Sequence, residues 1–151
     1  MSEPDPGLTG GCLCGAVRFS YSGPLGGELG AVTVCHCAQC RRAQGYAAAV
    51  APALARGFVV LRGRGEIGEY ESSPGKWRGF CRSCGSPLYS RRDARPDDLR
   101  LRLGAVDAAP PGLKVEAHIF TAGAPAWSFG DDAPRYAWFE PGRQPAAGAG
   151  G

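Results

Sequence analysis

The sequence lacks any long apolar run. No stretch of its 151 residues approaches the roughly 20 consecutive apolar residues that a membrane-spanning helix needs. The first ten residues, MSEPDPGLTG, carry acids and prolines where a signal peptide has a basic and then an apolar region. We therefore expect a cytoplasmic protein that has no membrane partner.

The sequence also lacks a large excess of positive or negative residues. Lys and Arg number 17 against 14 Asp and Glu, and the net charge is +3. Acidic residues interrupt every basic run, and the isoelectric point of about 8.5 falls short of that of a basic nucleic-acid-binding domain. Nucleic acid is therefore not expected as a partner.

Long helices, internal repeats and shifts of composition are absent as well. The chain has 24 glycines and 13 prolines, roughly twice the usual share, which favours short strands joined by tight turns. A single helical turn is predicted at residues 38–43. Alternation of apolar and polar residues predicts strands at residues 17–21, 31–34, 46–50, 58–61, 67–70, 88–90, 99–103 and 115–120. The expected fold is all-β or β-dominated, in one domain, with Leu99, Leu101 and Leu103 facing the core.

Cysteine, by contrast, is abundant. Seven cysteines in a reducing compartment are more readily explained as metal ligands or reactive thiols than as disulfides. They form three groups: Cys12 and Cys14; Cys35, Cys37 and Cys40; Cys81 and Cys84.

The first and last groups fit one closed zinc site. Residues two apart in extended chain point to the same face, so Cys12 and Cys14 can present two sulfurs to one ion. The CRSCG segment, with Cys81 and Cys84, has the spacing of a zinc knuckle. Four thiolates at about 2.3 Å complete the shell of a structural zinc. Such a site would staple a small domain together.

The middle group leaves one position open. Cys35, Cys37 and Cys40 supply three ligands, and three ligands with a vacancy describe a catalytic zinc. His36 is the rival for the fourth position, but in extended chain it points to the opposite face, so we favour a role in packing or behind the ligands. His118 is expected to be a hydrogen-bonded core or edge histidine rather than a pocket residue. The alternative is that both zincs are structural and perform no chemistry.

Three segments resemble a known family. GCLCGAV at residues 11–17, CHCAQCR at residues 35–41 and FCRSCGSPL at residues 80–88 are similar to the signature blocks of the glutathione-dependent formaldehyde-activating enzyme family, also called the centromere protein V/Gfa domain. The resemblance spans residues 8–139 as one zinc domain. It leaves residues 1–7 as a disordered lead and residues 140–151 as a flexible tail.

The resemblance implies a fold, two metal sites and an activity. The fold is Mss4-like, built from twisted antiparallel sheets. Two zinc ions per chain are implied, one structural and one catalytic, on ligand sets that agree with the spacing argument: Cys12, Cys14, Cys81 and Cys84; Cys35, Cys37 and Cys40. The activity is a carbon–sulfur lyase reaction that joins glutathione and formaldehyde as S-hydroxymethylglutathione.

The substrates expected from this resemblance are a small-molecule thiol and an aldehyde. Four basic residues could bind the carboxylates of a tripeptide thiol, although a solvated basic face is the favoured interpretation: Arg41, Arg42, Lys76 and Arg78. A zinc-stapled binding module without catalysis is the competing hypothesis, and thiol redox sensing at residues 35–40 is a third.

Overall fold

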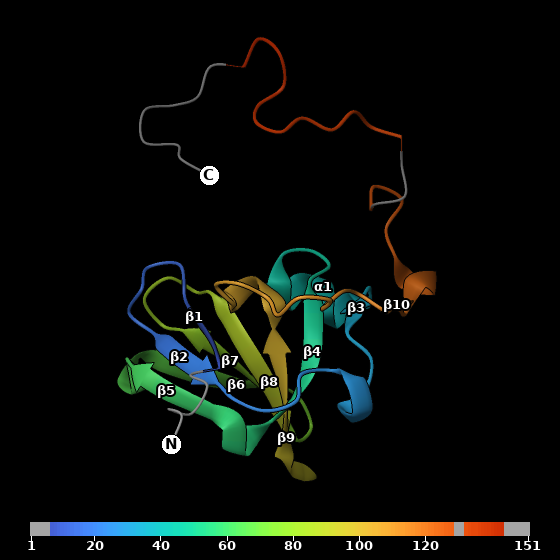
Figure 1. Cartoon of the computed structure of the whole chain (residues 1–151). Coiled ribbons are helices and arrows are strands. Elements are labelled where there is room, and N and C mark those ends of the chain that lie inside the picture. Colours follow the sequence, from blue (N-terminus) through green and yellow to red (C-terminus); the bar gives the residue numbers. More distant parts are fainter. Residues whose placement is uncertain (1–6, 129–131, 144–151) are drawn as a thin grey trace.

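Two β-sheets stack around one apolar core in the computed structural model, which describes residues 7–128 and 132–143 (Figure 1). The smaller sheet has three strands in the order β1-β2-β5, and each neighbouring pair is antiparallel. Its strands are β1 (Leu8–Gly11), β2 (Arg18–Tyr21) and β5 (Phe58–Arg62).

The larger sheet has seven strands in the order β10-β3-β4-β9-β8-β7-β6. Its strands are β3 (Thr33–Cys35), β4 (Ala49–Leu54), β6 (Ile67–Ser73), β7 (Lys76–Cys81), β8 (Pro87–Arg92), β9 (Arg95–Arg102) and β10 (Ala117–Ile119). The β-dominated prediction is confirmed. The sheet is mixed rather than purely antiparallel, because β10 returns over a long connection to lie parallel to β3 at the edge.

The helices of the chain are short. The one α-helix among the described residues is α1 (Ala38–Gln44), and it ends at Gly45, whose positive φ of 81° suits a glycine cap. Five 3-10 turns complete the elements: η1 (Gly27–Leu29), η2 (Ala55–Gly57), η3 (Arg64–Glu66), η4 (Leu103–Ala105) and η5 (Thr121–Gly123). Within the described ranges, no helix has the length and apolar character to cross a membrane.

The core lies between the two sheets. From the smaller sheet, Phe19 and Tyr21 are buried, and the Phe19 ring packs 4.8 Å from that of Phe58. From the larger sheet, Leu99 and Leu101 of β9 are buried as their alternation predicted. Each fully buried side chain of this size contributes about 1.5–3 kcal/mol of hydrophobic stabilisation. Leu103 differs from the prediction, since β9 ends at Arg102 and Leu103 opens η4, only partly buried.

Two strands have no counterpart among the predicted ones. β1 contains two glycines, and a Cβ on Gly10 would lie 2.2 Å from the backbone oxygen of Ala105, so the close approach of the chain there requires glycine. β7 carries Lys76 and Arg78 at alternate positions, which masks its strand pattern.

The predicted lead and tail lie mostly outside the described residues, which exclude 1–6 and 144–151. Residues 132–143 form no strand or helix, and they run apart from the sheets in Figure 1.

Candidate metal centres

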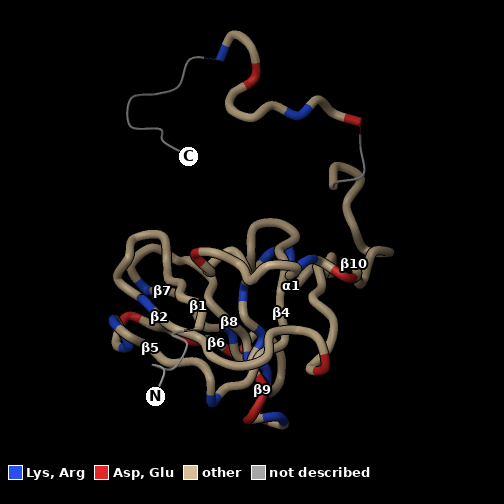
Figure 2. Tube along the Cα trace, in the orientation of Figure 1, with Lys and Arg blue, Asp and Glu red and all other residues tan. Residues whose placement is uncertain are grey.

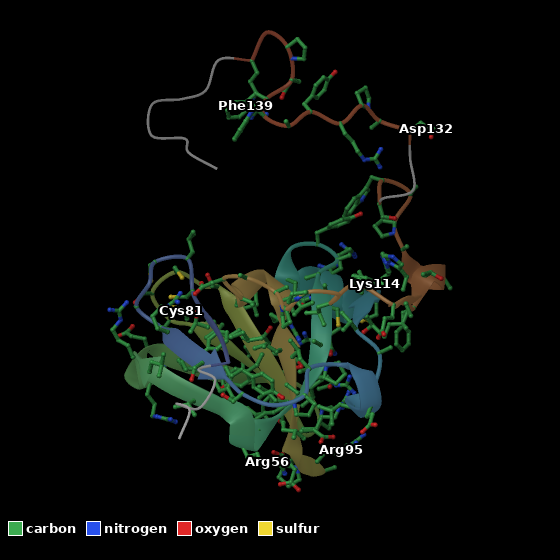
Figure 3. All side chains as sticks on the ribbon, in the orientation of Figure 1. Arg56, Cys81, Arg95, Lys114, Asp132 and Phe139 are labelled. Atoms are coloured by element: carbon green, nitrogen blue, oxygen red, sulfur yellow. The ribbon has the colours of Figure 1, made fainter. Side chains whose placement is uncertain are left out.

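Four cysteines from two distant turns meet at one end of the sheets. Cys12 and Cys14 follow β1, while Cys81 ends β7 and Cys84 lies in the turn before β8. Their sulfurs all lie within 4.8 Å of one another, with Cys12 Sγ 3.6 Å from Cys14 Sγ and the latter 3.8 Å from Cys81 Sγ. Figure 3 places Cys81, and with it this four-cysteine cluster, away from α1.

Two glycine turns bring these sulfurs together. The Gly85 N–H donates to the Cys81 carbonyl oxygen at 2.7 Å, and the Gly15 N–H donates to that of Cys12 at 3.2 Å. Both glycines have φ near +80°, a conformation that favours glycine. Cys12 and Cys14 therefore meet across a turn, and not along an extended strand as their spacing had indicated.

Polar hydrogens point at the cluster. The Val17 N–H donates to Cys12 Sγ at 3.2 Å, and Ser86 Oγ lies 3.2 Å from Cys84 Sγ. The hydroxyl and backbone N–H of Ser86 lower the pKa of Cys84 to about 5. Ser86 Oγ also accepts the Leu13 N–H at 2.9 Å, which ties the two turns to each other. Sequence reasoning overlooked Ser86, although it lies inside the CRSCGS segment.

The second cluster is built around the start of α1. Cys35 ends β3, Cys37 is the N-cap of α1, and Cys40 lies in the first turn of the helix. Cys37 Sγ accepts the Cys40 N–H at 3.3 Å, as a capping side chain does. The three sulfurs lie within 4.8 Å of one another. The structure thus brings together the three cysteines that the spacing had grouped.

His36 turns away from this three-cysteine cluster. It is 5% exposed, and its Nε2 lies 2.9 Å from Nδ1 of His118 on β10. Its backbone N–H donates to the Ile119 carbonyl oxygen at 2.9 Å, continuing the β3–β10 pairing. Within the described ranges, neither histidine belongs to a group of potential metal ligands.

Arg78 reaches the three-cysteine cluster from β7, which is separated from β3 by three strands in the sheet. It is 4% exposed, and its Nη2 donates to Gln39 Oε1 at 3.1 Å and to Cys40 Sγ at 3.5 Å. Burial raises the pKa of Cys40, but the hydrogen bonds from Arg78 and from the other two cysteines outweigh it, so the net pKa is lowered. Burial raises the pKa of Cys35 to about 12. The interpretation of Arg78 as part of a solvated face is wrong.

Both clusters fit zinc. Four thiolates at about 2.3 Å around a tetrahedral ion lie about 3.8 Å apart, and the sulfur separations of 3.6 and 3.8 Å match that spacing. Thiolates are the ligand type that zinc accepts well. Neighbouring thiols resist ionising together unless a cation compensates them, and the opposed pKa shifts of Cys35 and Cys40 show that competition. The two clusters can therefore bind metal ions, consistent with zinc.

A cavity of about 570 Å³ opens beside the three-cysteine cluster. Cys35, Cys37 and Cys40 all line it, together with residues of β7, β8 and β9. Its volume is within the range of about 300–1,000 Å³ typical of small-molecule sites. A cysteine cluster with this cavity at its side is accessible to a small ligand.

Comparisons with known proteins identify the family of the chain. The family model "Glutathione-dependent formaldehyde-activating enzyme" matches residues 7–123. The chain therefore belongs to this family, whose description indicates glutathione-dependent activation of formaldehyde. The crystal structure of a Rhodobacter sphaeroides protein, a structural-genomics target, is similar at a TM-score of 0.59 and 26% identity, over 74% of this chain and 99% of that one. No curated protein matches the chain significantly.

Proposed function

We propose that the chain is a zinc-dependent enzyme of the carbon–sulfur lyase type, which adds glutathione or a similar thiol to formaldehyde or another small aldehyde. One observation carries this proposal: all three cysteines of the second cluster line a cavity of small-molecule size. The family match supports the choice of thiol and aldehyde.

The two clusters have different roles in this proposal. Cys12, Cys14, Cys81 and Cys84 would hold a structural zinc, because they complete a four-thiolate set among themselves. Cys35, Cys37 and Cys40 would hold a second zinc with one position left for a ligand from the cavity. A zinc ion bound there would supply the positive charge that keeps an added thiol deprotonated at neutral pH.

Side chains around the three-cysteine cluster orient the sulfurs and supply a proton. The Arg78 hydrogen bond lowers the pKa of Cys40 and so favours its thiolate, and the Cys40 N–H fixes the direction of the Cys37 sulfur. In the net reaction the substrate sulfur bonds to the aldehyde carbon, and the carbonyl oxygen takes up a proton. Lys76 lines the cavity, and burial followed by the charge of Arg78 lowers the pKa of its ammonium. Lys76 is therefore the proton donor that we assign to the alkoxide oxygen.

The test must separate catalysis from the spontaneous addition of thiols to aldehydes. Exchange between free glutathione, formaldehyde and their adduct would be measured at equilibrium by NMR magnetisation transfer. The zinc-loaded protein should accelerate exchange without changing the equilibrium constant. Cys37→Ser should abolish the acceleration, while Arg56→Gln, which changes an exposed residue outside the cavity lining, should retain it.

Equal exchange rates with wild-type protein and Cys37→Ser, across several thiols and aldehydes, would refute the proposed reaction. If the cobalt-substituted protein nevertheless gained thiolate-to-metal charge-transfer absorption on adding glutathione, the function would be binding without catalysis.

A further inference from the structure

One face of the seven-stranded sheet is basic. Residues paired across neighbouring strands share a face, and the register pairs Arg100 with Ser90, and Ser90 in turn with Arg78. Arg102 lies two residues after Arg100, so it points the same way. The pair of Lys76 and Arg92 belongs to the same face. Figure 2 shows blue segments where β8 and β9 run side by side. The opposite face of β9 contributes Leu99 and Leu101 to the core.

This basic face lines the cavity beside the three-cysteine cluster. Arg92, Arg100 and Arg102 all border it, and so does Lys76. Arg102 also borders a second cavity of about 150 Å³, which it shares with Arg78. Lys76, Arg92, Arg100 and Arg102 therefore converge from three adjacent strands on the larger cavity.

Acidic residues do not neutralise these arginines. The carboxylate of Asp98 is the acidic side chain among the described lining residues, and Arg95 Nε already holds it at 2.6 Å. Arg91, another lining residue, is paired with Glu69 and Asp93. Within the part of the chain that the structure describes, no carboxylate pairs with Arg92, Arg100 or Arg102.

Two of the cations are also deeply buried. Arg102 is 5% exposed, and its Nη1 donates a long hydrogen bond of 3.4 Å to the Arg100 carbonyl oxygen. Arg78 is 4% exposed, and its Nε and Nη1 have no hydrogen-bond partner in the described protein. Burial, and then repulsion from Arg78, lowers the pKa of Arg102 to about 10, so the Arg102 guanidinium is charged at neutral pH.

Charged groups buried without partners are costly unless a counter-charge offsets them. Three thiolates around Zn²⁺ would leave about one net negative charge. That offsets about one cation, and a basic surplus remains.

We propose that this cavity binds a small oxyanion ligand that carries at least two negative charges, either a phosphate ester or a dicarboxylate. Arginine forks match both phosphate and carboxylate oxygens. Because the three cysteines border the same cavity, an anion held by the arginines would present its other end to them.

Calorimetric titration of the zinc-loaded protein tests this binding site without any thiol or aldehyde. The probes are glycerol 3-phosphate, succinate and acetate, at constant ionic strength. Glycerol 3-phosphate or succinate should bind about tenfold or more tightly than acetate, since each added charge-assisted contact is worth about that factor. The tighter of the first two identifies phosphate ester or dicarboxylate as the ligand class.

Variants then locate the site. Arg100→Gln changes an exposed side chain at the cavity and should weaken binding about tenfold without affecting folding. Arg102→Gln should weaken it further, and circular dichroism would verify that the variant is folded. Arg56→Gln, the matched control, should bind as the wild type does. The proposal is overturned if neither dianion binds at millimolar concentration, if acetate binds as tightly as both, or if Arg100→Gln and Arg56→Gln have equal effects.

The proposal concerns binding alone, so it can stand or fall independently of the exchange assay for thiol–aldehyde chemistry.

Discussion

Arg78 on β7 and Cys40 on α1 are 38 residues apart in the chain, and Arg78 Nη2 lies 3.5 Å from Cys40 Sγ inside the protein. The contact joins a strand of the larger sheet to the helix that carries Cys40. It places a guanidinium in hydrogen-bonding contact with one sulfur of the three-cysteine cluster.

Removal of this guanidinium should weaken metal binding at the three-cysteine cluster. Arg78→Gln takes away the charge that favours the Cys40 thiolate, and loss of a group that hydrogen-bonds a ligand typically costs about 10–100-fold in metal affinity. Competition with a chromophoric chelator measures that affinity. Arg78→Lys should restore part of it, and Arg56→Gln should have no effect. Unchanged affinity in Arg78→Gln would show that the contact is only a packing contact.

The two clusters should differ in what they stabilise. We expect two zinc ions per chain under reducing conditions. Cys12→Ser should lower the free energy of unfolding by about 4 kcal/mol or more, because the four-cysteine cluster links the β1–β2 turn of one sheet to the β7–β8 turn of the other. Cys40→Ser should cost much less, since its cluster joins residues only five positions apart.

Metal analysis and urea unfolding of both variants measure this difference. One zinc or none in the freshly purified wild type, or equal destabilisation by the two substitutions, would contradict the assignment.

His36 should prove dispensable for metal coordination. Its Nε2 faces His118 at 2.9 Å rather than the sulfurs, so His36→Gln should leave the tetrahedral absorption bands of the cobalt-substituted protein in place. The loss of cobalt affinity should stay below the ~10-fold typical for removal of a group that contacts a ligand. Altered absorption bands together with a larger loss would identify His36 as the fourth ligand.

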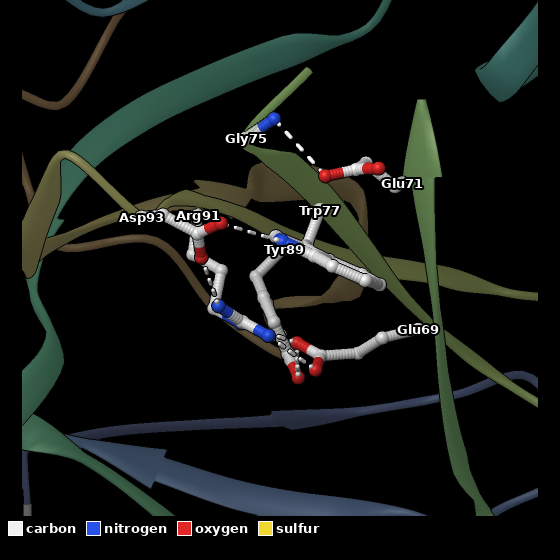
Figure 4. Close-up of polar contacts among 7 residues, drawn as sticks. All are labelled: Glu69, Glu71, Gly75, Trp77, Tyr89, Arg91 and Asp93. Carbon is white, nitrogen blue, oxygen red and sulfur yellow. Dashed lines mark hydrogen bonds and ion pairs between the residues drawn. The ribbon is translucent and has the colours of Figure 1, made fainter. Parts of the chain in front are cut away.

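A polar network on β6, β7 and β8 predicts a pH dependence of stability. Arg91 contacts both carboxylate oxygens of Glu69 at 2.8 Å, and the Tyr89 hydroxyl donates to Oε2 at 2.9 Å (Figure 4). The Arg91 hydrogen bonds, reinforced by Tyr89, hold the pKa of Glu69 below its usual 4.5 despite burial. A carboxyl with a lowered folded-state pKa stabilises the fold above its unfolded pKa, and this contribution is lost as pH falls.

Glu69→Gln should therefore be less stable than the wild type by about 1 kcal/mol at pH 7, with the gap narrowing below about pH 4.5. Urea unfolding of the zinc-loaded proteins between pH 7.5 and 4 measures the gap. Glu71→Gln is the matched control, because a glutamine amide oxygen can still accept the Gly75 N–H that Glu71 accepts. Identical pH profiles for the two variants would contradict a special role for Glu69.

The grouping of the cysteines could be predicted largely from the sequence, because it depends on local structure. The spacing of Cys81 and Cys84 before Gly85 encodes a turn that aims two sulfurs at one point, and Cys37 and Cys40 share the first turn of a helix. The period-two alternation of β9 likewise predicted the core residues Leu99 and Leu101, since alternate side chains of a strand share a face. These features depend on neighbours a few residues apart.

The surroundings of the metal centres were decided by the tertiary structure. Arg78 looks like a surface cation in the sequence, yet in the fold it lies against Gln39 and Cys40 of α1, so its guanidinium is buried. His118 meets His36 only because β10 crosses back to pair with β3. The basic face exists because the register of β7, β8 and β9 aligns cations that are separated by more than twenty positions. The sequence shows which residues are charged. Whether a charged side chain is buried, and which groups it contacts, depends on which strands become neighbours in the whole fold.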